Sequence, residues 1–94
     1  MNGDLGKHEE MQGELLARLR KIEGQVRGVH KMIQDQRGCG EIVIQLAAIK
    51  SAINRVGMNV LGCHLSDQIE KGLAEGKDVK ESISDFMTVF NNFS

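Results

Sequence analysis

The sequence contains no proline, tryptophan or tyrosine, and only two of its 94 residues are cysteines. Its three aromatic residues, Phe86, Phe90 and Phe93, all lie within the last nine positions. A core must therefore consist mainly of Leu, Ile, Val, Met and Ala, a composition that favours helices. A chain of this length rarely holds two separate cores, so we expect one domain over residues 1–94 and exclude a large multidomain enzyme.

Long apolar runs are also missing. No segment approaches the roughly 18 apolar residues of a transmembrane helix, and Met1–Glu10 lacks the basic and apolar regions of a signal peptide. We expect a cytoplasmic protein without membrane contact, in which residues 1–9 are mobile. Cys39 and Cys63 form no C-x-x-C pair, which excludes a disulfide framework and a structural zinc motif. In a reducing compartment both are thiols that metals or electrophiles can reach.

Apolar residues at steps of three and four predict two long helices. The first is expected from about Glu10 to Gln36, with a seam formed by Leu15, Leu19, Ile22, Val26, Val29 and Ile33. The second is expected from about Gly40 to Lys71, with a seam formed by Ile42, Leu46, Ile49, Ile53, Val56 and Val60. The segment Arg37–Gly40 interrupts the pattern between them.

A third, shorter helix is predicted after Asp78, because Asp78 and Glu81 match a helix-capping signature. Its apolar face is formed by Val79, Ile83, Phe86 and Phe90. The fold class is therefore all-α, with two long antiparallel helices and a short C-terminal helix. Because a two-helix hairpin leaves one side of each seam exposed, we expect helices of a partner chain to complete a four-helix bundle.

Cys39 and His64 lie on one stripe of the second helix. They are 25 residues apart, so at 100° per residue they point within about 20° of each other, yet they are separated by roughly 37 Å along the axis. An antiparallel partner chain would bring Cys39 of one protomer to His64 of the other. Thiolate and imidazole suit Cu(I), Zn(II), Co(II) or Ni(II). Cys63 continues the row of Ile42, Ile49 and Val56 and is more typical of core filling.

Positive charge is concentrated in one segment. Residues 15–37 carry a net charge of +4, whereas residues 1–14 and 66–94 each carry −3. Arg20, Arg27 and Lys31 form a basic stripe on the first helix. Arg18, Lys21 and Arg55 add charge nearby, and symmetry would repeat this pattern at positions suited to DNA phosphates. The alternative is a solvated face without a ligand.

The segments Arg18–Ile33, Gln45–Asn54 and Asn59–Leu65, together with Cys39, resemble the CsoR/RcnR family of bacterial repressors. The most specific features are the R-x-x-x-I-x-G-Q motif that begins at Arg18, the cysteine that opens the second helix, and the histidine 25 residues later. The resemblance implies three-helix chains whose dimers pair into tetramers, which bind operator DNA through basic surface and release it when an effector binds. It also matches Arg18 and Arg55 to arginines implicated in DNA binding.

In copper-sensing members of that family, Cu(I) is held by a cysteine at the Cys39 position of one protomer and by ligands at the His64 and Gln68 positions of the other. Here Gln68 replaces a cysteine, so a copper site would be two-coordinate or would recruit Cys63. By the same resemblance, Glu81 stands in for a glutamate that supports the metal ligands without binding the metal, and Gly38 replaces a supporting tyrosine.

Other effectors remain open at the same cysteine. Nickel and cobalt sensors have a histidine at the Gln68 position and a ligand near Lys7, where His8 is one place off. Formaldehyde sensors use an N-terminal proline, and persulfide sensors use a second cysteine at the Gln68 position. We therefore expect an effector-responsive repressor rather than an enzyme, with Cu(I) as the first choice of effector. The alternatives are another effector, or a helical metal-binding protein without DNA binding.

Overall fold

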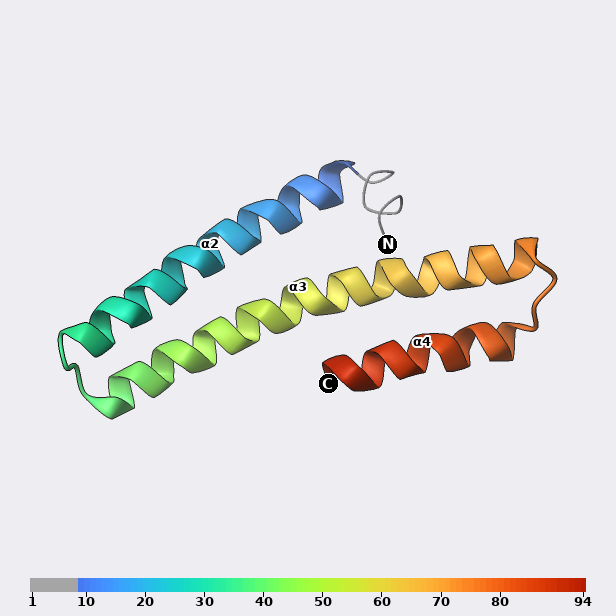
Figure 1. Cartoon of the computed structure of the whole chain (residues 1–94). Coiled ribbons are helices and arrows are strands. Elements are labelled where there is room, and N and C mark those ends of the chain that lie inside the picture. Colours follow the sequence, from blue (N-terminus) through green and yellow to red (C-terminus); the bar gives the residue numbers. More distant parts are fainter. Residues whose placement is uncertain (1–8) are drawn as a thin grey trace. The chain divides into compact units, whose positions relative to one another are not determined.

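The computed structural model describes residues 9–94, which form three α-helices and no strand within that range (Figure 1). Helix α2 spans Glu9–Gln34, α3 spans Cys39–Ala74 and α4 spans Val79–Phe93. The predicted all-α class with two long helices and one short helix is confirmed. Across the described residues, none of the helices combines the length and the apolar character needed to span a membrane.

Both long helices end with the same hydrogen-bonding pattern, in which the last carbonyls accept from residues in the turn. After α2, the Arg37 amide donates to Met32 at 2.9 Å, and after α3 the Lys77 amide donates to Gly72 at 2.7 Å. Each pattern needs a residue with positive φ just past the helix. This residue is Gly76 after α3, with φ 73°, but Gln36 after α2, with φ 57°. Helix α2 therefore ends two residues earlier than predicted, and α3 begins at Cys39.

The chain divides into two compact units, one of which comprises Glu10–Val56. In this unit α2 runs antiparallel to the first half of α3 (Figure 1). Its core consists of Ile22, Val29 and Ile49, with Ile42, Ala52 and Val56 packed against them. The row of Ile42, Ile49 and Val56 that the sequence pattern indicated is thus the side of α3 that faces α2.

Much of each predicted seam remains exposed in the single chain. On α2, Val26 and Ile33 are 50% and 59% exposed, and on α3, Leu46 and Ile53 are 48% and 45% exposed. These residues alternate with the buried ones, as expected for helices whose apolar stripes are wider than one neighbour can cover. Apolar surface is therefore available to a further chain.

The second unit contains the second half of α3, from Gly57, together with α4. The Asp78 side chain caps α4 by accepting from the Lys80 amide at 3.2 Å, which confirms the predicted start of this helix. Ser82 is buried against Gly72, where an added Cβ would overlap the Ser82 hydroxyl. The Phe93 ring lies against Gly57 in the same manner.

The predicted apolar face of α4 is partly wrong. Phe86 and Phe90 are half-buried as predicted, but Val79 and Ile83 are exposed and the small Ser82 lies inside. At the close approach to Gly72 there is room only for a small side chain, and Ser82 fills this position. Helical periodicity alone did not indicate that a serine would occupy the most enclosed position.

Candidate nucleic-acid interface and metal-ligating residues

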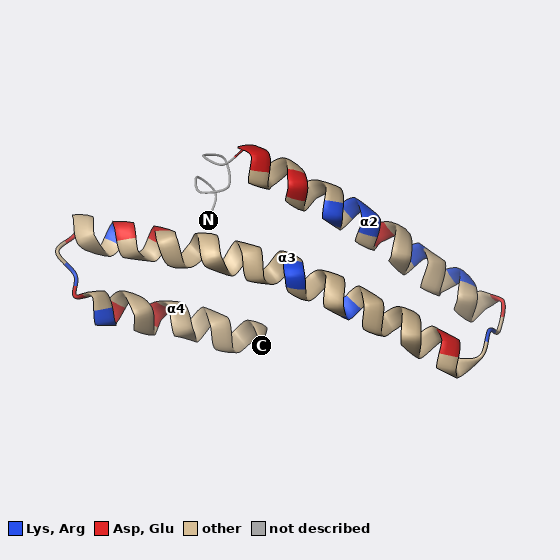
Figure 2. Cartoon of the chain, turned by 180° about the vertical axis from the view of Figure 1, so that it is seen from behind, with Lys and Arg blue, Asp and Glu red and all other residues tan. Residues whose placement is uncertain are grey.

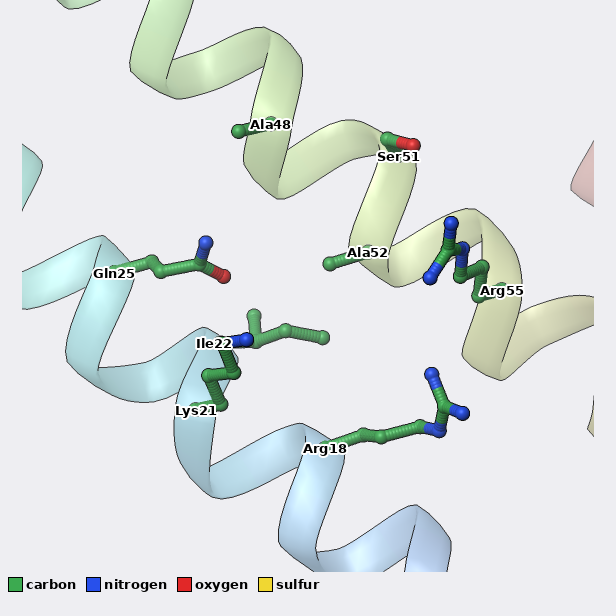
Figure 3. A pocket seen from close by; sticks show the side chains of 8 residues that line it. All are labelled: Arg18, Lys21, Ile22, Gln25, Ala48, Ser51, Ala52 and Arg55. Carbon is green, nitrogen blue, oxygen red and sulfur yellow. The ribbon is translucent and has the colours of Figure 1, made fainter.

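A cleft of about 300 Å³ lies between α2 and the first half of α3 (Figure 3). The side chains that line it carry three positive charges and no negative charge; they are Arg18, Lys21, Ile22, Gln25, Ala48, Ser51, Ala52 and Arg55. Residues 18, 21, 22 and 25 lie one turn apart on one face of α2, because helical neighbours are three or four positions apart. The apolar floor formed by Ile22 and Ala52 continues the core, so the charged side chains stand at its rim.

Arg18 and Arg55 extend towards the same side of this cleft from the two helices (Figure 3). Guanidinium groups present several donors in a fixed planar arrangement that matches phosphate oxygens. In the free chain, Arg18 donates through one terminal nitrogen to Glu14 at 3.1 Å. Two polar atoms at the cleft, Arg18 Nε and Gln25 Oε1, are buried and have no hydrogen-bond partner within the part of the chain that the structure describes.

The six predicted DNA-contacting residues fall into two groups. Arg18, Lys21 and Arg55 come together at the cleft. Arg20, Arg27 and Lys31 do not line it, but they are exposed on α2. Figure 2 shows that the basic residues of this unit are distributed along α2 and the first half of α3. The cleft is therefore a local concentration of charge within a wider basic surface.

Sequence reasoning missed Gln25 and Ser51, which line this cleft, and Glu14, which pairs with Arg18 from outside it. Gln25 follows Lys21 by four positions and Arg18 by seven, so helical spacing places it on the same face. That spacing was a usable signal for Gln25. Glu14 likewise precedes Arg18 by four positions, the favourable order for an ion pair. Ser51 lies on another helix, and nothing in the sequence indicated its position.

Cys39 is the first residue of α3 and its side chain is exposed. Beside it in sequence, Arg37 donates two hydrogen bonds to the Glu41 carboxylate, at 3.0 and 3.2 Å. These bonds and the attraction between the charges raise the pKa of Arg37 and lower the pKa of Glu41. The pair links the turn to the first turn of α3, and it leaves the Cys39 thiol open to a ligand.

His64 lies in the second unit, where its imidazole is half-buried beside Phe86, with ring centroids 6.2 Å apart. Its Nε2 atom is buried without a hydrogen-bond partner among residues 9–94. A buried polar atom without a partner is costly, by about 1–3 kcal/mol, and calls for an explanation such as a ligand. The imidazole therefore fits a site in which one nitrogen binds a metal and the other needs a supporting partner.

The remaining predicted site residues have less distinctive surroundings. Cys63 is half-buried, in keeping with its predicted place in the core row, whereas Glu81 is exposed in the first turn of α4. Gln68 is half-buried. Across residues 9–94, no three His, Cys, Asp or Glu side chains lie close enough to share a metal ion. His8 and the expected mobility of residues 1–9 fall largely outside the described residues.

Residues 12–92 match the family model described as "Metal-sensitive transcriptional repressor". The chain belongs to this family. Members of the metal-sensitive repressor family regulate transcription, so this repressor is not an enzyme. The resemblance to CsoR/RcnR repressors that the sequence motifs indicated is confirmed.

Two curated relatives support the assignment of this metal-sensitive repressor. The copper-sensing transcriptional repressor CsoR of Bacillus subtilis (strain 168) is 31% identical over 88 residues, which cover 94% of this chain and 86% of that protein. The copper-sensing transcriptional repressor RicR of Mycobacterium tuberculosis is 42% identical over 59 residues, which cover 63% of this chain and 62% of that protein.

Solved structures show the same helical architecture as this repressor. The copper-sensing repressor CsoR with Cu(I) from Geobacillus thermodenitrificans NG80-2 has a TM-score of 0.75 and 40% identity, over 90% of this chain and 86% of that chain. The nickel-responsive transcriptional regulator InrS has a TM-score of 0.73 and 34% identity, over 87% of this chain and 91% of that chain. A copper-sensing repressor and a nickel-responsive transcriptional regulator thus share this fold.

Proposed function

We propose that this repressor binds operator DNA through the basic cleft between α2 and α3 and releases it when Cu(I) binds between two protomers. The observation that carries the DNA-binding part is the convergence of Arg18, Lys21 and Arg55 from two helices on a cleft lined by no acidic side chain. Arg20, Arg27 and Lys31 extend the contact surface along α2. Operator DNA in a bacterium lies in the cytoplasm, so the same proposal places the protein there.

The proposed metal site takes Cys39 from one protomer and His64 from the other, with Cys63 as a further sulfur ligand. Three observations support this donor set: the exposed Cys39 thiol, the buried and unpartnered Nε2 of His64, and the position of Cys63 next to that histidine. Sulfur and imidazole are soft to borderline donors that suit Cu(I). When bound, Cu(I) would join the thiolate of one chain to the imidazole of its partner.

Copper is favoured over other effectors by the donor set and by the copper-sensing relatives. Another metal is the second candidate, because the nickel-responsive regulator InrS is also similar to this chain. Formaldehyde and persulfides would act at the same Cys39 thiol, since it is the exposed nucleophile of the site. Glu81, which is exposed in the first turn of α4, is proposed to support the metal site rather than to ligate the metal.

The proposal requires association of the chains. The exposed apolar residues Val26, Ile33, Leu46 and Ile53 support it, because a surface of this kind is unfavourable in a monomer. We propose that two chains form a four-helix bundle and that two such dimers form a tetramer. Coupling between the metal and DNA sites would be a free energy of about 1–3 kcal/mol, which corresponds to an affinity loss of roughly 5- to 150-fold.

The DNA-binding proposal is tested by the double variant Arg18→Ala/Arg55→Ala. We expect at least a tenfold loss of affinity for a duplex that the wild-type protein selects from a random-sequence pool. The salt dependence should also weaken, by about one unit of slope per lost phosphate contact. Lys71→Ala/Lys80→Ala is the control, because it removes the same charge from the other unit of the chain. Retention of affinity by the first variant, with unchanged helical content, would contradict the assignment.

The metal proposal is tested by anaerobic Cu(I) titration in the presence of a competing chelator, with DNA binding followed by fluorescence anisotropy in the same samples. Cys39→Ala should keep DNA binding and lose Cu(I)-dependent release, whereas Cys63→Ala should weaken the response. Normal release from the Cys39→Ala variant would refute the proposed site. Titration with Ni(II) and with formaldehyde identifies which effector acts if Cu(I) does not.

A further inference from the structure

The cleft between α2 and α3 contains more than positive charge. Arg18 Nε, a donor, and Gln25 Oε1, an acceptor, are both buried there without a partner within the described residues. Arg18 is held from outside the cleft by Glu14, which accepts from a terminal nitrogen of the guanidinium at 3.1 Å. In the free chain one terminal nitrogen of this guanidinium is therefore engaged, whereas its Nε–H has no partner within the described residues.

The lining selects the ligand by charge and by geometry. Three cationic side chains and no carboxylate favour an anion. A volume of about 300 Å³ is ample for a phosphate group but small for a folded segment of another protein. Gln25 can turn its amide by half a rotation and present NH₂ instead of oxygen, and it loses no hydrogen bond because Oε1 has no partner within residues 9–94.

We infer that this cleft seats a single phosphate of the DNA backbone, that Gln25 donates a hydrogen bond to it, and that Glu14 competes with it for Arg18. The inference rests on the proposed DNA-binding function and adds two residues to it. Glu14 and the phosphate are both negatively charged, and both accept hydrogen bonds from the Arg18 guanidinium. Glu14 therefore lowers the affinity of the free protein for DNA.

The exposure of the Arg18–Glu14 ion pair limits how much the removal of Glu14 can raise the affinity for DNA. The side chains of Arg18 and Glu14 are 39% and 64% exposed, and exposed pairs of this kind contribute little because water and salt screen them. We expect Glu14→Gln to raise affinity for a random-sequence duplex about two- to fivefold at low salt. The gain should shrink as salt increases, because the screening length shortens. An increase in affinity is informative because misfolding does not produce it.

Glu23→Gln is the matched control. Glu23 is an exposed carboxylate on the same helix, but it does not line the cleft, and the ion pair of Arg18 is with Glu14. Its removal measures the effect of net charge alone. Gln25→Ala should lower affinity several-fold, whereas Gln25→Glu should lower it further by placing a carboxylate beside the phosphate.

Inorganic phosphate tests the cleft without DNA. In NMR titrations of the full chain, the Gln25 side-chain amide and the Arg18 Nε–H should shift in a saturable manner, and at lower phosphate concentration in Glu14→Gln. Absence of these shifts would overturn the anion site.

The DNA experiments separate the two proposals. Equal DNA affinities of Glu14→Gln and Glu23→Gln, together with an unchanged affinity of Gln25→Ala, would refute the proposed phosphate site. The proposed function would still stand if Arg18→Ala/Arg55→Ala abolished DNA binding. Absence of DNA binding by the wild-type protein would refute the proposed function, and the phosphate titration would still report on the cleft.

Discussion

The contact between Gly72 and Ser82 sets the position of α4. A double-mutant cycle measures the coupling energy between these two residues. A Cβ at residue 72 would overlap the Ser82 hydroxyl, whereas its distances to the Cβ atoms of Ser82 and Lys77, 3.5 and 3.6 Å, are ordinary contacts. The hydroxyl alone therefore prevents a larger residue at position 72. Gly72→Ala should be destabilising, and Ser82→Ala should restore stability by removing the obstructing atom.

Two opposing contributions determine how much Gly72→Ala changes the free energy of unfolding. Overpacking of an enclosed site costs about 1–3 kcal/mol, and replacement of a helical glycine by alanine gains about 1 kcal/mol in helix propensity. We expect Gly72→Ala to lower the free energy of unfolding by up to about 2 kcal/mol. In the Ser82→Ala background the same change should be neutral or stabilising, which gives a coupling energy of about 1–3 kcal/mol.

The assay is urea unfolding followed by circular dichroism, at one protein concentration because association shifts the apparent stability. Gly62→Ala is the control: a Cβ there meets nothing within 4 Å, so the propensity gain should appear alone. A stabilising Gly72→Ala, or equal effects of this change with and without the Ser82 hydroxyl, would refute the reasoning. Since α4 also brings Phe86 to the His64 imidazole, the same variants should shift the His64 ring resonances.

Two further predictions concern the turns that follow α2 and α3. Gln36→Gly should stabilise the fold by about 0.5–1 kcal/mol, because glycine avoids the cost of positive φ, although it loses more entropy on folding. Gly76→Ala should destabilise the fold by a similar amount, because alanine would have to adopt the positive φ. Changes of the same sign in the thermal stability of the two variants would contradict this prediction. Because Arg37 lowers the pKa of Glu41, the stabilising effect of their pair should begin to decline as pH falls into the usual glutamate range, where the unfolded chain takes up the proton, and should be lost below the lowered pKa. NMR titration of the Glu41 carboxylate should show this lowered midpoint, and Arg37→Ala should return it to the ordinary range.

The helices and the chemical groups that they carry could be predicted from the order of residues alone. Periodic apolar residues predicted both long helices, Asp78 predicted the start of α4, and the motif that begins at Arg18 identified the family, because these signals are local or retained in the order of residues. Cys39 and His64 were recognisable as candidate ligands from residue type and spacing alone.

Which of these residues meet in space depends on how the helices pack. Angular position on one helix does not say where a second helix crosses it, so the convergence of Arg18 with Arg55, and the exclusion of the Arg20 stripe from the cleft, could not be predicted from periodicity. The burial of Ser82 required knowledge of the close approach at Gly72. The unpartnered His64 nitrogen likewise depends on what surrounds it in space, because hydrogen bonding is satisfied by three-dimensional neighbours and not by neighbours in sequence.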